Sequence, residues 1–173
     1  TLAMLFSTGA LARVEHLWLS NDRLGPAGAS ALFDGLCWGS APRLRNLYLH
    51  ANELGGVGAA ALAAALSRGA LPNLEVLLNA ENQIGDEGLV ALAAPLRRRP
   101  ALRTLSLLSN GIGDAGVAAL VDKLGAKEFK QLKFLDLAGN RLGDDGCATL
   151  TAALDGATLP ALRLLNNTVH MNS

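Results

Sequence analysis

The side chains best able to do acid–base, nucleophilic or metal chemistry are scarce in this chain. Its 173 residues include three histidines and two cysteines, Cys37 and Cys147. Covalent catalysis requires a base within hydrogen-bond reach of the nucleophile, and a zinc site requires several nitrogen or sulfur ligands together. No carboxylate or cysteine joins His16 and His50 on the strand face defined below, and neither a G-x-x-x-x-G-K-[ST] loop nor an H-E-x-x-H pair occurs. We therefore expect no enzymatic activity, no metal site and no cofactor.

The chain contains a repeated sequence motif of the form L-x-x-L-x-L-x-x-N-x-L-G, and its clearest copy runs from Leu44 to Gly55. Successive copies are 30, 30, 28, 30 and 30 residues apart. They open at Val14, Leu44, Leu74, Leu102, Leu132 and Leu162. A period of this size indicates one supersecondary unit stacked on copies of itself. We expect residues 1–173 to form a single repeat domain, and a segment of a longer protein, because no polar end cap is recognisable.

Each copy predicts a strand, a turn and a returning helix. In the second copy Leu47 and Leu49 are two residues apart, as in a strand with one buried face, and Asn52 follows where the chain must turn. Helical leucines four residues apart then face inward. These pairs are Leu32/Leu36, Leu62/Leu66, Leu92/Leu96, Leu120/Leu124 and Leu150/Leu154. Because one unit cannot bury its leucines alone, stacking should pool them between a parallel sheet and a layer of helices.

These residues resemble the ribonuclease-inhibitor-like class of leucine-rich repeats. The resemblance rests on the leucine motif of the strand, on the Leu/Ile-Gly-x-x-Gly link and on the helical leucine pair, and it covers nearly the whole chain. Similar repeats occur in NOD-like receptors and in Ran GTPase-activating protein. The resemblance implies an α/β leucine-rich-repeat solenoid, a right-handed horseshoe with parallel strands on the concave face and helices on the convex face. It also implies that the concave face binds a protein partner.

Four positions depart from the repeat pattern: Asp22 and His170 at the turn, and Asn79 and Asn167 at the third strand leucine. Asp22 occupies the turn position where the next four copies have asparagine, and an ionised carboxylate accepts hydrogen bonds but cannot donate them, so the first turn should be wetter or looser. Asn79 occupies a strand position where most copies have leucine, and a buried unpaired amide would cost about 1–3 kcal/mol. Either Asn79 finds backbone partners, or its strand shifts so that Leu78 points inward.

The predicted binding surface is the concave face, where alternate strand positions form columns of side chains that the core does not need. Trp18 and Tyr48 should be direct neighbours on adjacent strands. Such a pair is either a binding hot spot or a contact that only stabilises the two strands. Phe134 and Asp136 form a second, weaker patch. The predicted partner-binding residues are His16, Trp18, Asn46, Tyr48, His50, Leu78, Phe134 and Asp136.

Several charged residues have a structural interpretation. A column of alternating sign just before the strands, Glu15, Arg45, Glu75 and Arg103, predicts solvated ion pairs worth at most about 1 kcal/mol each. Acidic residues at three helix starts, Asp86, Asp114 and Asp144, favour the positive end of the helix dipole. Residues 97–99 are three arginines at a helix C-terminus, where cations complement the dipole, and an anion contact is the alternative.

Composition limits the partners and the location. Lysine plus arginine number 15, as do aspartate plus glutamate, so the net charge is zero and the basic footprint of a nucleic-acid-binding protein is missing. No apolar run is long enough to cross a bilayer, and residues 1–6 carry no basic signal-peptide region. Two cysteines do not form a disulfide framework. We expect an intracellular, cytoplasmic protein without membrane insertion or nucleic acid.

Three functions fit these observations. The first is a non-enzymatic scaffold that binds a protein partner, alone or within a larger complex, through the concave face. The second is a structural subunit of a large assembly, held by its ends and its convex face. The third is activation of a small GTPase, which rests only on the resemblance to the Ran regulator.

Overall fold

The computed structural model describes residues 2–37, 39–125, 127–155, 159 and 161–166. Within these residues helices and strands alternate strictly. They are α1 (Leu2–Ser7), β1 (His16–Trp18), α2 (Gly25–Asp34), β2 (Asn46–Tyr48), α3 (Gly55–Ser67), β3 (Val76–Leu78), α4 (Gly85–Arg97), β4 (Thr104–Ser106), α5 (Asp114–Val121), β5 (Phe134–Asp136), α6 (Asp144–Asp155) and β6 (Leu164–Asn166).

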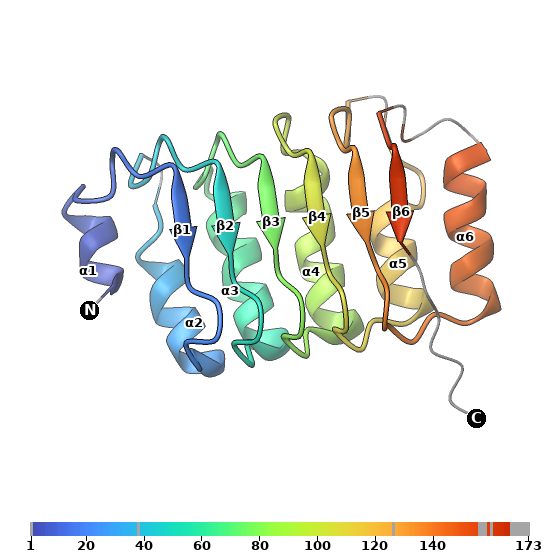
Figure 1. Ribbon diagram of the computed structural model, residues 1–173, viewed down its shortest axis with the longest axis horizontal. Helices are drawn as coiled ribbons and strands as arrows, with labels where there is room; N and C mark the ends of the chain where they lie inside the picture. The colour runs from blue at the N-terminus through green and yellow to red at the C-terminus, as the bar shows by residue number, and fades with distance from the viewer. Residues whose placement is uncertain (1, 38, 126, 156–158, 160, 167–173) are drawn as a thin grey trace.

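The strands form one parallel sheet in the order β1-β2-β3-β4-β5-β6. Figure 1 shows the sheet as one layer and the helices as a second layer behind it. The predicted fold class, an α/β solenoid of stacked units, is therefore confirmed. Since all strands run the same way, the loops leading into them lie along one edge of the molecule, which we call the strand-start edge. The turns that follow the strands, with the first turns of the helices, form the strand-end edge.

A ladder of asparagine side chains connects the turns of the strand-end edge. Asn52 Oδ1 accepts a hydrogen bond from the Asp22 backbone N–H at 3.0 Å, and Asn82 Oδ1 accepts one from the Asn52 N–H at 2.9 Å. Asn110 and Asn140 continue the same pattern at 3.0 and 2.9 Å. Asp22 joins the ladder only through its backbone, and its exposed carboxylate makes no hydrogen bond to any described residue. The first turn therefore lacks the amide that ties the other turns together.

Asn79 is fully buried, yet the strand that it follows keeps its register. Leu78 still pairs with Tyr48 on one side and with Ser106 on the other, so a shift of this strand is excluded. Asn79 Oδ1 accepts a hydrogen bond from Asn82 Nδ2 at 2.7 Å, whereas Asn79 Nδ2 has no partner among the described residues. The side-chain partner of Asn79 is thus another amide rather than the backbone.

Most of the predicted inward-facing helical leucines are buried, but the prediction is wrong for two of them. Leu124 is only partly buried because α5 ends at Val121: Asp122 adopts extended backbone with ψ 138° and Lys123 has φ +50°. Leu154, in the last turn of α6, is 42% exposed. The other eight leucines of these pairs belong to one continuous core with the strand leucines.

Asp86 and Asp114 lie in the first turns of α4 and α5, and each also caps the helix of the following unit. Asp86 Oδ1 accepts hydrogen bonds from the N–H groups of Gly113 at 2.7 Å and Gly116 at 2.9 Å, at the start of α5. Asp114 does the same for Gly143, at the start of α6. Because the carboxylate sits against the helix, Gly116 has no room for a side chain: a Cβ there would lie 2.6 Å from Asp86 Oδ1.

We predict that Gly116→Ala lowers the free energy of unfolding by about 1–3 kcal/mol, because the added methyl displaces Asp86 from its cap. Gly28 is the matched control, since it holds the same position in the first unit and its nearest neighbour would be 3.6 Å away. Gly28→Ala should leave stability unchanged or raise it by up to about 1 kcal/mol through helix propensity. Urea unfolding followed by circular dichroism measures both, and equal effects would contradict the capping role of Asp86.

We also predict that Asn79→Leu raises the free energy of unfolding by about 1 kcal/mol or more, because it removes a buried donor without a partner. Asn82 Nδ2 would keep its bonds to the carbonyls of Leu49 at 2.9 Å and Ala80 at 3.0 Å. The reciprocal change, Leu49→Asn, buries a new amide and should destabilise the protein. A lower thermal midpoint for Asn79→Leu would show that its amide is satisfied in solution.

Candidate functional site

The most prominent feature of the sheet face is an aromatic stack between β1 and β2. Trp18 and Tyr48 are paired neighbours in the sheet, as predicted, and their ring centroids lie 3.8 Å apart with an interplanar angle of 13°. Trp18 nevertheless remains 68% exposed. The Trp18 indole is therefore held on the surface by its stack with Tyr48, and it is not part of the hydrophobic core.

Polar groups surround this stack and orient it. Asn46 Nδ2 donates a hydrogen bond to Tyr48 Oη at 3.1 Å, and Asn21 Nδ2 lies 3.1 Å from His50 Nε2. His16 is exposed and paired with Asn46 across the two strands. The structure thus brings together five of the predicted residues, which we call the aromatic patch: His16, Trp18, Asn46, Tyr48 and His50. Asn21 was not predicted, since its position outside the strand columns gave no reason to select it.

The three remaining predicted residues are distributed along the sheet. Leu78 is half-buried on β3 and pairs with Tyr48, so it extends the aromatic patch by one strand. Phe134 and Asp136 lie on β5, beyond β4, and form a separate patch. The Asp136 carboxylate accepts a hydrogen bond from Ser106 Oγ at 3.3 Å and one from the Ala138 N–H at 3.1 Å. The predicted residues therefore make two separate surfaces, the aromatic patch and the second patch on β5.

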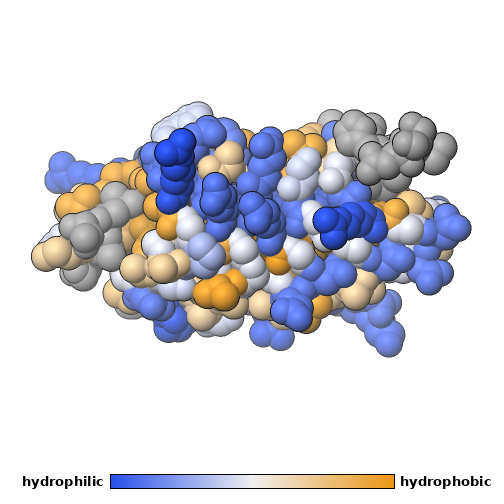
Figure 2. Space-filling view, turned by 90° about the horizontal axis from the view of Figure 1, so that it is seen from below, coloured by the Kyte–Doolittle hydropathy of each residue, from blue (hydrophilic) through white to orange (hydrophobic). Residues whose placement is uncertain are grey.

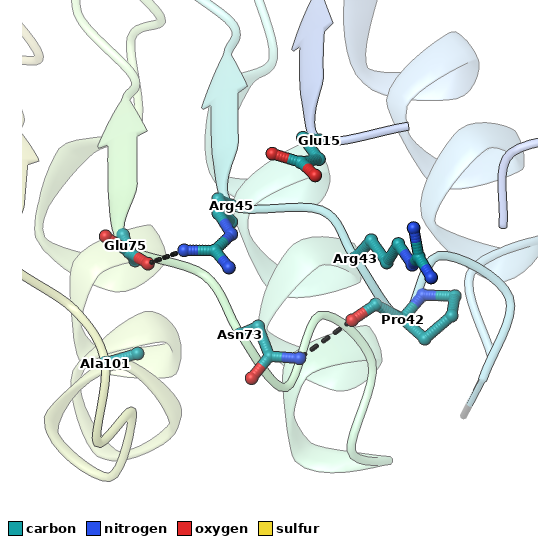
Figure 3. Close-up of a pocket in the computed structure, with 7 residues that line it drawn as sticks. All are labelled: Glu15, Pro42, Arg43, Arg45, Asn73, Glu75 and Ala101. Atoms are coloured by element: carbon teal, nitrogen blue, oxygen red, sulfur yellow. Dashed lines mark hydrogen bonds and ion pairs between the residues drawn. The ribbon is translucent and has the colours of Figure 1, made fainter. Parts of the chain in front are cut away.

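A shallow hollow of about 430 Å³ lies on the strand-start edge, before β1 to β4 (Figure 3). Its lining consists of Glu15, Pro42, Arg43, Arg45, Asn73, Glu75 and Ala101. Arg45 Nη1 donates to Glu75 Oε1 at 2.9 Å, and Arg103 approaches the other oxygen of Glu75 at 3.8 Å. The predicted ion-pair column is thus formed by these three residues, whereas Glu15 makes no ion pair within the described chain. With charges of both signs and no nucleophile beside a base, the hollow can recognise polar groups but offers no evident chemistry.

Two of the three arginines at 97–99 link neighbouring units. Arg97 contacts Glu128 through Nη2 at 2.7 Å and also donates to the Ala119 carbonyl of α5 at 3.1 Å. Arg99 donates to the Leu66 and Ala70 carbonyls at the end of α3, and its burial lowers the pKa of its guanidinium. These cations complement the C-termini of adjacent helices rather than that of α4 alone. An anion could therefore meet only Arg98 without displacing existing bonds.

The described residues contain no group of three or more His, Cys, Asp or Glu residues that could hold a metal ion. Nor does the described part of the chain include a helix that is both long and apolar enough to cross a membrane.

Comparison with known proteins agrees with the geometry. The family model of the leucine-rich repeat matches residues 80–93, 100–121 and 131–150, which span the turn and first part of α4, then β4 to α5, then β5 and most of α6. A comparison with curated proteins gave no match. Leucine-rich repeats and six parallel strands alternating with helices together identify the fold as an α/β leucine-rich-repeat solenoid.

The Glu128 ion pair predicts a pH-dependent stability. The Gly125 N–H, at 2.7 Å, and the Arg97 guanidinium hold the pKa of Glu128 below its usual value of 4.5, against the opposing effect of burial. The carboxylate therefore contributes stability that is complete above pH 4.5 and is lost as pH falls through the lowered folded-state pKa. We predict that Glu128→Gln destabilises the protein at neutral pH and that the difference from wild type disappears in acid. Urea unfolding at a series of pH values measures this difference, and parallel stability curves would contradict the prediction.

Proposed function

We propose that this chain is a non-enzymatic scaffold that binds a protein partner through its sheet face, with the aromatic patch at the centre of the contact. The observation that carries the proposal is the exposed Trp18–Tyr48 stack. Leucine-rich-repeat domains generally mediate protein–protein interaction, and the presence of such repeats supports the same conclusion.

The energetics of recognition favour this patch over the rest of the face. Tryptophan and tyrosine supply large contact areas with few rotatable bonds, so their immobilisation on binding costs little entropy. Here the stack and the Asn46 bond already fix both rings before a partner arrives. Truncation of such anchors typically weakens an interface by 2 kcal/mol or more. The surrounding imidazoles and amides of His16, His50 and Asn46 would form the polar rim.

The helices support the finer subclass proposed from the sequence. A Leu-Gly or Ile-Gly link leads directly into α3 and α4, which are regular helices of 13 residues each. Full helices opposite each strand are what the resemblance to ribonuclease-inhibitor-like repeats implies. We retain that subclass and an intracellular location as parts of the proposal.

Capture from an extract of the source cells, quantified by mass spectrometry, tests the proposal. We predict that Trp18→Ala lowers the recovery of at least one protein by about tenfold or more, because the indole is the main contact. The fold should be unaffected, since the core does not use this ring, and the unfolding midpoint checks this.

Two variants serve as controls for that experiment. Val90→Ala removes an exposed apolar side chain from α4, on the opposite face, and should retain the Trp18-dependent protein. Phe134→Ala tests the second patch of the sheet face separately. Partners that persist with Trp18→Ala but are lost with Val90→Ala would place the interface on the helices and contradict the proposal.

A further inference from the structure

The zero net charge of this chain conceals a strong separation of charge between its two edges. The strand-end edge carries an excess of acidic residues, eight against two arginines. They are counted over residues 19–28, 49–58, 79–88, 107–117 and 137–147. Along the strand-start edge the excess is of the opposite sign and is concentrated in the second half. Residues 98–103, 122–125, 127–133 and 161–163 contain eight lysines and arginines and two acidic residues. The molecule therefore has an acidic edge and, before β4 to β6, a basic one.

Helix capping accounts for only part of this separation. Acidic residues at helix starts and basic residues at helix ends stabilise parallel helices, and Asp86, Asp114 and Arg99 make such contacts. Arg103, Lys133 and Arg163, in contrast, come immediately before strands β4, β5 and β6 and outside the last turn of any helix. We call these three residues the basic row. Their positions require another explanation.

The basic row is a continuous line across adjacent strands. The Lys133 N–H donates to the Arg103 carbonyl at 2.8 Å, and the Arg163 N–H donates to the Lys133 carbonyl at 2.8 Å. Neighbouring backbones in such a sheet are about 4.8 Å apart. All three residues are exposed, and the row continues the line of Glu15, Arg45 and Glu75 in Figure 3. Unlike that first part of the line, it does not alternate in sign.

Few acidic groups neutralise the basic row within the molecule. Arg103 has only the 3.8 Å approach to Glu75, whose closer partner is Arg45 at 2.9 Å. Lys133 and Arg163 form no ion pair with a described residue. The acidic residues nearest to Lys133 in sequence already have partners: Asp136 accepts hydrogen bonds from Ser106 Oγ and the Ala138 N–H, and Glu128 is held by Arg97 and by the Gly125 N–H. Like charges at facing positions of neighbouring strands repel each other, so an external anion would relieve a cost already present in the folded protein.

We propose that the basic row docks an acidic polypeptide segment, a run of aspartates and glutamates in the partner protein. This inference rests on the proposed function and specifies the chemistry of its partner. The row spans about 10 Å, which three or four residues of an extended chain cover. Phe134, directly after Lys133 on β5, supplies an apolar contact for a side chain flanking the carboxylates. The acidic segment would then bind the strand-start edge before β4 to β6, while another part of the partner binds the aromatic patch on β1 and β2.

The distribution of charge favours an acidic polypeptide over a nucleic acid. A long polyanion that crossed the sheet would meet Asp136, on the same strand as Phe134, and then the acidic strand-end edge. Figure 2 shows hydrophilic residues gathered over the middle and right of this edge, with apolar residues between them. A short acidic segment can remain on the strand-start side, where the basic row alone determines the potential.

Fluorescence anisotropy with a labelled peptide of about ten glutamates, long enough to span the row, tests the proposal at low salt. The test variant is Arg103→Gln/Lys133→Gln/Arg163→Gln. Its control has the same net charge, Arg13→Gln/Arg23→Gln/Arg141→Gln, and changes three exposed arginines elsewhere. We expect the row variant to bind about tenfold or more weakly and the control to change less than about twofold, with wild-type affinity falling as salt rises.

Several outcomes would overturn the proposal. Equal weakening by the two variants would show a response to net charge alone. Tighter binding of an oligothymidylate of similar length, lost in the row variant, would assign the row to nucleic acid. Self-association at low salt that the row variant abolishes would assign it to the acidic edge of a second copy. If the peptide fails to bind while Trp18-dependent capture persists in the row variant, the acidic segment is wrong and the scaffold stands.

Discussion

The asparagine ladder formed by Asn52, Asn82, Asn110 and Asn140 is the interaction on which the rest of this structure depends. The turns place several residues at positive φ, among them Ala51 at 54° and Glu53 at 56°. The Asn52 side chain between these two residues is fully buried. Asn52 satisfies groups of two successive turns, donating to the Leu19 and Leu49 carbonyls at 2.6 and 2.8 Å and accepting from the Asp22 N–H. Because leaving such groups unpaired is costly, one unit is incomplete without the next. Stacking in fixed register follows directly from this requirement.

That fixed register separates the residues that fold the chain from those that are available for recognition. Leu17, Leu47 and Leu77 form one interior row, of which Leu47 and Leu77 are fully buried, while the neighbouring positions on the opposite face contribute no core contact. Trp18 and Tyr48 meet because the ladder aligns their strands, and the basic row is aligned by the same means. Side chains on such a surface can be substituted without a change in the fold, so they are free to be selected for binding.

The sequence predicted the periodic features of this molecule but not the side-chain contacts between neighbouring units. The strands, the parallel order and the Trp18–Tyr48 contact all follow from the phase of the repeat. The capping of α5 by Asp86 does not, because it depends on how closely two helices approach and on the rotamer of one carboxylate. Arg99 was likewise assigned to its own helix. The 28-residue step shortens its loop to 98–103, and the side chain instead reaches the end of α3. For Asn79 the sequence predicted either hydrogen-bond partners or a shift of its strand, and the structure shows that the strand does not shift.

Net charge is a poor guide to partners for a solenoid, and the reason is geometric. In a globular domain, residues of equivalent sequence phase point in many directions, so a whole-chain sum approximates what a partner meets. In parallel stacking, every residue that precedes a strand lies on one edge, and every residue that follows a strand lies on the other. Charge is therefore sorted by phase, and the 15 basic and 15 acidic residues cancel in the sum although the strand-end segments hold eight of the acidic residues and only two of the basic ones. The informative quantity is the charge at each position of the repeat, which here shows an acidic excess on the strand-end edge and a basic excess before β4 to β6.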